Sequence, residues 1–407
     1  MEQRLLPEER ALLGTIEEDE VVGFLQALIQ ARSDYPPGDT RAAMAVVADK
    51  LHLADLNPQI VARQPHQPSV IAELPAAVAG PTLLYHAHAD TVPAGDPAQW
   101  QHDPFAGKRV GNLIFGRGAG DDKGSVAAQI MALVTLARQG VTGDGRLQLA
   151  IVADEESDAL QGTRWLRDSG QLQPDYLVVG EQTANQIAIA ERVACGIDLI
   201  VYGRSTHGAT PWAGENAILK AAQALGWLEA RLFPRLQSKK HPFLPPATLN
   251  IGKIQGGLQW NIVPDRCTVD MDRRLLPGET REAAMAEIRA VLDEYCETVA
   301  PLSYELYTQG DVAANINTPP NDPFVRTAGL ALQAVSGQRR DLTGYLQTSD
   351  GRWFANDGFP IIIFGPGDPA VAHATDEHIT VAQLMEATRF LTLLGWRWLK
   401  DADKRQE

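Results

Sequence analysis

The segment His88-Ala89-Asp90 closes an apolar run that begins at Thr82 and is rich in strand-forming residues. In a strand, residues two apart point to the same side, so the Asp90 carboxylate could hold the His88 ring and fix its tautomer. Carboxylates play this part beside metal-bound histidines. His86 would face the same way and is a rival ligand, and a polar strand end without a metal is the other interpretation.

Two further segments concentrate carboxylates. Gly116 to Gly124 holds four glycines and the pair Asp121-Asp122, which could also be plain helix N-caps. Its spacing differs from that of a phosphate-binding loop. Asp154-Glu155-Glu156 directly follows the apolar run 147–153, and three adjacent acids repel one another unless cations compensate. A solvated acidic turn is the alternative there.

Two more polar residues come after apolar runs that read as strands. Glu181 follows the run 176–179, and His373 lies beyond the run 360–364. Taken alone, His373 would be read as an ordinary loop histidine. The strand ends together present nitrogen and oxygen donors that suit zinc, namely His88, Asp121, Glu156, Glu181 and His373.

The charges of this set favour two metal ions over one. Two Zn²⁺ ions carry four positive charges, which three carboxylates and one hydroxide would balance while both histidines stay neutral. A carboxylate shared by both ions would hold them roughly 3.5–4 Å apart. Glu155 would then remain as a free carboxylate beside the metals, placed to accept a proton from water.

The elements that must position these residues read as an α/β domain. The apolar runs alternate with helical stretches such as 123–138, which predicts a mixed, largely parallel sheet with helices on both faces. Ligand sites of open α/β sheets lie beyond the carboxyl ends of the strands. The polar segments described above all fall at such ends.

The pattern changes near residue 194, which predicts an inserted domain over 194–306. Its expected elements follow the order β-α-β-β-α-β of ferredoxin-like α+β domains. The α/β pattern resumes afterwards. We therefore expect a discontinuous catalytic domain, 1–193 and 307–407, around a lid or dimerisation domain.

Bulk composition narrows the partners and the compartment. The formal net charge of −15 disfavours nucleic-acid binding, which needs a basic face. The sequence contains no run of about 18 apolar residues, so no membrane span is expected. The start of the chain lacks the apolar stretch of a signal peptide, and three scattered cysteines form no paired motif. Cytoplasm is the expected location.

These motifs, in this order, resemble the zinc-dependent exopeptidase and deacylase family of acetylornithine deacetylase, succinyl-diaminopimelate desuccinylase, aminoacylase and carboxypeptidase G. The resemblance covers about 83–377. The segments that carry it are His88 to Pro93, Gly116 to Gly124, Asp154 to Glu156, Gly180-Glu181, Ser205 to Gly208, Asp272 to Gly278, and Gly365 to His373.

The resemblance implies a role for each site residue. It pairs His88 with Glu181 on one zinc and Glu156 with His373 on the other. Asp121 would bridge the two ions, and the peptide bond after it would be cis. The remaining roles concern protons and orientation: Asp90 would orient His88, and Glu155 would act as the general base.

The resemblance also implies roles for the inserted domain. His207 would reach the active site of a neighbouring subunit and stabilise the developing oxyanion. Arg274 and Asn261 would hold the substrate carboxylate or nearby polar groups, and an arginine suits a carboxylate because its guanidinium can bind it with two hydrogen bonds. The protein would then be a homodimer formed through this domain.

The implied reaction is hydrolysis of an amide bond in a small carboxylate-bearing molecule, with two Zn²⁺ per chain, or Co²⁺ or Mn²⁺ in their place. An N-acyl amino acid is the leading substrate, with acetylornithine first. A dipeptidase or carboxypeptidase of the same family is the runner-up. From other classes, a non-catalytic binding homologue and a two-metal phosphoesterase remain as alternatives.

Overall fold

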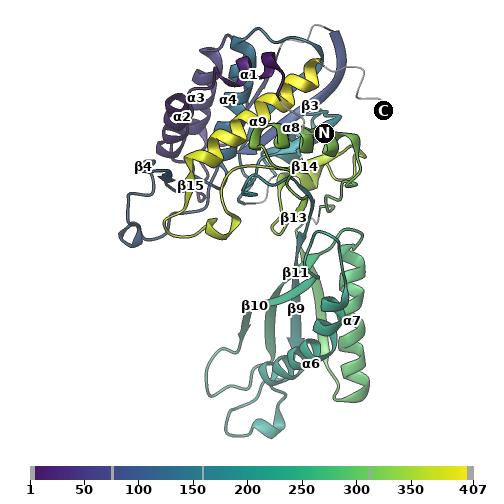
Figure 1. Cartoon of the computed structure of the whole chain (residues 1–407). Helices are drawn as coiled ribbons and strands as arrows, with labels where there is room; N and C mark the ends of the chain where they lie inside the picture. The colour runs from purple at the N-terminus through teal and green to yellow at the C-terminus, as the bar shows by residue number, and fades with distance from the viewer. Residues whose placement is uncertain (1–4, 75–77, 158–159, 311–312, 401–407) are drawn as a thin grey trace. The chain divides into compact units, whose positions relative to one another are not determined.

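The computed structural model describes residues 5–74, 78–157, 160–310 and 313–400. Its chain divides into two compact units (Figure 1). Unit 1 comprises Met1–Ile189, Asn317–Thr343 and Ser349–Glu407, and unit 2 comprises Ala190–Ile316 and Gly344–Thr348. The sequence analysis places the inserted domain at 194–306, and the observed unit adds residues on both sides and a short later segment.

Unit 1 is built on an eight-stranded sheet in the order β1-β2-β6-β3-β7-β14-β8-β13. Strand β3 pairs in parallel with β6 and β7, and β7 pairs in parallel with β14. The outer pairs β1–β2, β2–β6 and β14–β8 are antiparallel. The strands are β1 (Gln59–Val61), β2 (Ser69–Glu73), β3 (Val78–His88), β6 (Asp144–Val152), β7 (Tyr176–Val179), β8 (Ala188–Glu191), β13 (Thr343–Tyr345) and β14 (Ile361–Ile363).

The central strands are buried on both faces, as parallel strands covered by helices must be. Leu83, Leu84 and Tyr85, three consecutive residues of β3, have no exposed surface. The helices of this unit are α1 (Pro7–Leu13), α2 (Glu18–Gln30), α3 (Arg41–His52), α4 (Lys123–Arg138), α5 (Thr163–Asp168), α8 (Pro323–Ser336) and α9 (Val381–Lys400). The mixed, largely parallel α/β sheet predicted from the sequence is confirmed.

Unit 2 holds an antiparallel sheet in the order β10-β11-β9-β12 with two helices. Its elements are β9 (Val193–Tyr202), α6 (Ala217–Ser238), β10 (Thr248–Gly256), β11 (Arg266–Leu275), α7 (Arg281–Thr298) and β12 (Ser303–Gln309). This chain order and this strand order are those of a ferredoxin-like domain. Alternate residues of β9 and β11 point into one core with the apolar faces of α6 and α7.

Several elements differ from the sequence-based expectation. Helix α6 continues through Pro234 to Ser238, although a proline favours an earlier end, because Leu232 and Leu236 keep its apolar face buried. A three-stranded sheet of β4 (Lys108–Val110), β5 (Leu113–Phe115) and β15 (His378–Thr380) was not foreseen. Among the described residues, no helix has the length and hydropathy of a membrane span.

Candidate metal centre

The predicted ligands follow neighbouring strands of the central sheet. His88 is the last residue of β3, Glu156 comes four residues after β6, and Glu181 comes two after β7. Asp121 lies in the loop before α4, and His373 lies in the loop after β14. Parallel strands end at the same edge of a sheet, so their loops converge there.

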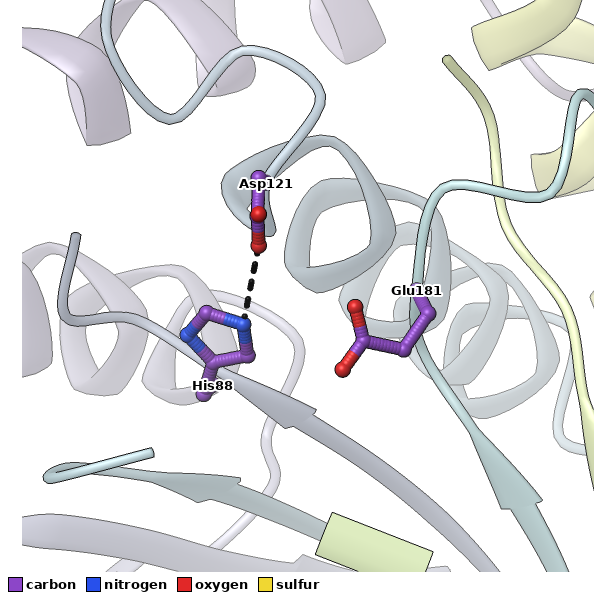
Figure 2. Close-up of side chains that lie close together, drawn as sticks. All are labelled: His88, Asp121 and Glu181. Atoms are coloured by element: carbon purple, nitrogen blue, oxygen red, sulfur yellow. Dashed lines mark ion pairs between the residues drawn. The ribbon is translucent and has the colours of Figure 1, made fainter. Parts of the chain in front are cut away.

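His88, Asp121 and Glu181 form the first cluster (Figure 2). Each offers one ligand atom, and these atoms all lie within 4.8 Å of one another. The Nε2 atom of His88 is 3.2 Å from Oδ1 of Asp121. All three side chains are buried, so solvent screens their charges only weakly.

Asp121, Glu156 and His373 form the second cluster by the same criterion. The Nε2 atom of His373 lies 3.1 Å from Oδ2 of Asp121 and 3.1 Å from Oε1 of Glu156. Asp121 therefore belongs to both clusters and presents a different oxygen to each histidine. The peptide bond that follows Asp121 is cis, as the resemblance implies.

The electrostatics of this site fit cations. Burial and then the Asp121 charge raise the pKa of Glu156 to about 7, and the same two causes raise the pKa of Glu181. Hydrogen bonds with Asp121 and then Glu156 raise the pKa of His373 to about 10. Buried acids crowded in this way favour bound positive charge, and the donors are those that zinc takes.

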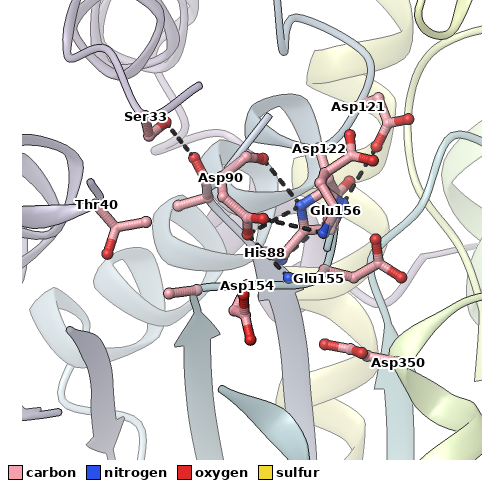
Figure 3. A network of polar contacts seen from close by, with 12 residues as sticks. Ser33, Thr40, His88, Asp90, Asp121, Asp122, Asp154, Glu155, Glu156 and Asp350 are labelled. Atoms are coloured by element: carbon pink, nitrogen blue, oxygen red, sulfur yellow. Dashed lines mark hydrogen bonds and ion pairs between the residues drawn. The ribbon is translucent and has the colours of Figure 1, made fainter. Parts of the chain in front are cut away.

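Asp90 supports two parts of the site (Figure 3). Its carbonyl oxygen lies 3.0 Å from Nδ1 of His88, while its carboxylate lies 3.6 Å from that atom. The carboxylate accepts hydrogen bonds from the amides of Glu155 at 3.2 Å and Glu156 at 3.0 Å. Asp90 thus contacts the His88 ring and fixes the backbone that carries the acid pair.

The three adjacent acids after β6 point in different directions. Asp154, at φ +73°, accepts hydrogen bonds from Gln67 and from the amide of Gln161, which ties down its own loop. Glu156 belongs to the second cluster. Glu155 lies beside the cluster, and its charge contributes to raising the pKa values of His88, Glu156 and Glu181.

A buried ion pair joins the two loops that carry Asp121 and His373. Glu377 Oε1 accepts hydrogen bonds from the amides of Gly120 at 2.9 Å and Asp121 at 3.0 Å. Arg117 pairs with the same carboxylate and donates to the carbonyl oxygen of His373 at 3.2 Å. Both charged side chains are almost fully buried.

Gly180 allows the loop of Glu181 to come close to its neighbours. A Cβ atom at this position would lie 2.7 Å from the Cβ of Ser125 and 2.9 Å from that of Ala87. Both contacts are much shorter than a van der Waals separation. Any larger residue here would push Glu181 away from His88.

The rival ligand His86 lies outside both clusters. Its Nε2 atom is 2.8 Å from Oγ1 of Thr163, which in turn donates to the buried carboxylate of Asp350. Burial and then the nearby His88 lower the pKa of His86 to about 3. The ring is therefore a neutral, hydrogen-bonded group of the core.

The predicted substrate residues lie in unit 2. His207 is exposed, and Asn261 lies next to it, since the amide of Gly208 donates to the Asn261 carbonyl at 2.7 Å. Arg274 donates to Asp272 at 3.0 Å. Arg274 also donates to Oγ1 of Thr348, which in turn donates to the carbonyl oxygen of Arg192 at 2.9 Å, so Arg192 and Arg274 contact the same threonine.

Sequence reasoning missed four charged residues around these groups, namely Arg117, Arg192, Arg352 and Glu377. Arg117 and Glu377 each lie four residues from a predicted ligand, a spacing that could have drawn attention to them. Arg352 lies far in the sequence from every predicted site residue. Nothing local singles out Arg192, which lies between β8 and β9, because Arg274 belongs to the distant strand β11.

Comparisons with known proteins agree with this geometry. Residues 84–396 match the model of Peptidase family M20/M25/M40. A succinyl-diaminopimelate desuccinylase of Rhodospirillum centenum is 32% identical over 336 residues, which cover 80% of this chain and 83% of that protein.

Solved structures share the fold at low identity. A family M20 metallo-carboxypeptidase of Sulfolobus solfataricus aligns with a TM-score of 0.75 and 18% identity over 92% of this chain and 98% of its own. Human carnosine dipeptidase 1 aligns with a TM-score of 0.75 and 18% identity over 96% and 98%.

The chain belongs to peptidase family M20/M25/M40. It is a metal-dependent hydrolase that acts on amide bonds, with its candidate ligands gathered in two clusters that share Asp121. The family resemblance that the sequence motifs indicate is therefore confirmed.

Proposed function

We propose that this enzyme removes the acyl group from an N-acyl-L-amino acid. The observation that carries the proposal is the pair of clusters around Asp121, with the extra carboxylate of Glu155 beside them. A non-catalytic binding homologue would have lost a ligand or this acid, and the chain keeps all of them.

In this proposal His88 and Glu181 would hold one zinc ion, Glu156 and His373 would hold the other, and Asp121 would contribute to both sites. Bound zinc would lower the pKa of water and polarise the amide carbonyl. Co²⁺ and Mn²⁺ suit the same donors and are possible substitutes.

The chain's own groups then move the proton and orient the substrate. Glu155 takes a proton from the attacking water and later passes it to the departing nitrogen. Asp90 holds the backbone of Glu155 in place. We further propose that His207, supplied by a partner subunit, stabilises the developing oxyanion, while Asn261 and Arg274 bind the substrate's polar groups.

The acyl group is the least determined part of the substrate. An acetylornithine-like compound is the first expectation from the sequence, while the curated relative is a desuccinylase. Arg192 and Arg274 both contact Thr348, and two arginines in one region suit a substrate with more than one carboxylate. This favours a succinyl over an acetyl group. A dipeptide or peptide carboxylate remains the alternative substrate within the family.

We also propose a homodimer formed through unit 2. Trp260, Leu258 and Trp212 are 97%, 87% and 80% exposed in the single chain, and large exposed apolar side chains are typical of contact surfaces. A measurement of the molar mass in solution tests the proposed homodimer.

A cytoplasmic location is supported by the three free cysteines Cys195, Cys267 and Cys296.

A substrate panel tests the proposal. Protein loaded with zinc or cobalt should hydrolyse at least one N-succinyl or N-acetyl amino acid faster than any dipeptide. Faster cleavage of dipeptides would assign the peptidase alternative. Hydrolysis of an aryl phosphate ester without hydrolysis of any amide would overturn the proposal in favour of a phosphoesterase.

A further inference from the structure

Glu155 has a cationic partner outside the metal clusters. The Nη1 atom of Arg352 lies 3.1 Å from Oε1 of Glu155, and the two side chains are only 13% and 11% exposed. Arg352 belongs to the 3-10 helix η3 (Asp350–Trp353) and lies 197 positions after Glu155 in the sequence. Water screens such a sheltered ion pair less than it screens an exposed one.

The contact uses one oxygen of the carboxylate. Oε1 of Glu155 accepts a hydrogen bond from Nη1 of Arg352. The amide of Glu155 is held separately by Asp90 at 3.2 Å. The backbone of Glu155 and one of its carboxylate oxygens are therefore fixed by separate partners.

Arg352 is itself held firmly. It donates to the carbonyl oxygen of Ser349 at 3.2 Å, lies 3.7 Å from the buried carboxylate of Asp350, and packs 5.2 Å from the Trp353 ring centre. Asp350 in turn accepts a hydrogen bond from Thr163. Because Arg352 is itself held in place, it can hold the Glu155 side chain in one orientation.

We propose that Arg352 is a positioning residue that holds the Glu155 carboxylate in the orientation required for proton transfer. The inference rests on the proposed role of Glu155 as general base. A glutamate side chain has several rotatable bonds, and fixing them in advance removes the cost of ordering the base at each turnover. Arg352 need not touch the substrate or the metals for this effect.

The test compares Arg352→Ala and Arg352→Lys with the wild type, using the best substrate of the panel. Since a base misplaced by about 1 Å can cost about 100-fold, Arg352→Ala should lower kcat by about that factor and leave KM within about twofold. Metal content should stay at two ions per chain. Arg352→Lys should recover part of the rate, because its ammonium can reach one oxygen.

Two controls separate positioning from a merely structural role. Arg164 lies 5.1 Å from the ring centre of the same Trp353, and Arg164→Ala should keep the wild-type kcat. If Arg352 only neutralised Asp350, the double variant Asp350→Asn with Arg352→Ala would regain the wild-type rate. We expect the double variant to keep the low kcat of Arg352→Ala.

A crystal structure of metal-loaded Arg352→Ala gives a readout that does not depend on activity. We expect the Glu155 carboxylate to leave its wild-type position while both metal sites stay filled. An unmoved carboxylate, or an unchanged kcat in Arg352→Ala, would overturn the inference and leave the proposed function standing. Failure of the wild type on every panel substrate would instead overturn the proposed function, and the structure would still decide what Arg352 holds.

Discussion

Glu155 and Glu156 are adjacent in the chain yet have different surroundings. Glu156 shares a histidine with Asp121, whereas Glu155 pairs with Arg352 and lies beside the cluster. The two adjacent acids contact different partners because the turn after β6 points their side chains in different directions. The chemistry assigned to each follows from its partners.

The role of Glu155 predicts that Glu155→Gln loses turnover and keeps its metals. The amide cannot accept a proton, and loss of general acid–base catalysis typically costs about 10²–10⁴-fold. Steady-state kinetics and metal analysis on the same sample check this. Loss of both metals together with activity would show that Glu155 is a ligand.

Metal affinity should rise with pH. Without metal, hydrogen bonds with Asp121 and Glu156 raise the pKa of His373 to about 10, so its ring carries a proton at pH 7. That protonated state is stable below the raised pKa and is lost as the pH rises through it. A metal ion must displace the proton, so affinity should increase about tenfold per pH unit for each proton displaced.

Competition titrations of metal-free protein with a chelator between pH 6 and pH 8 measure this slope. Glu156, whose pKa is raised to about 7, should steepen the slope in the lower half of that range. A pH-independent affinity would mean that His373 is not a ligand. A variant without this ring, His373→Ala, should show a shallower dependence.

At the scale of elements, the site depends on the loops that follow β3, β6, β7 and β14 and on the loop before α4 that carries Asp121. The strand order brings these ends together, and buried contacts between loops set the final geometry. The Arg117–Glu377 pair contacts the loop of Asp121 and the loop of His373 at once. These two loops are therefore expected to move together.

Arg117→Ala should weaken metal binding by about 10–100-fold, as removal of supporting groups around metal ligands commonly does. It leaves the Glu377 carboxylate buried without its cation and loosens the loop of His373. Isothermal titration of metal-free protein measures the loss. Arg109→Ala, which removes an exposed ion pair with Glu18, is the matched control and should bind metal normally.

The sequence could single out His88, Glu156 and Glu181 because each lies at or just after the end of an apolar run. Asp121 and His373 follow no such run directly, and it is the family resemblance that supports their place in the set of candidate ligands. The helix over 123–138 was predicted with its observed bounds. The short strands β4, β5 and β15 were not, since three residues are too few to show a period of two. Arg352 escaped notice because its partner Glu155 lies 197 positions away, and only the folded chain joins them.

At the scale of the whole molecule, the proposed ligands span residues 88 to 373, and all belong to unit 1. A bound metal ion would therefore connect parts of the chain that are far apart in the sequence. Unit 2, whose strands and helices have a core of their own, contributes no residue to either cluster. Metal should stabilise the first unit much more than the second.

Removal of the metals should lower the Tm of unit 1. A ligand at a hundredfold its Kd stabilises the folded state by about 2.7 kcal/mol, which corresponds to roughly 5 °C or more in a unit of this size. Calorimetry of chelator-treated and reloaded protein measures the shift. The transition of unit 2 should stay in place, and a uniform shift of both would contradict this assignment.

The central claim is that Asp121 joins two metal sites. Anomalous X-ray diffraction from crystals of the zinc-loaded protein tests it most directly. The account predicts two peaks, one beside His88 and Glu181 and one beside Glu156 and His373, with Asp121 in contact with both. A single peak, or two peaks that Asp121 does not join, would contradict it.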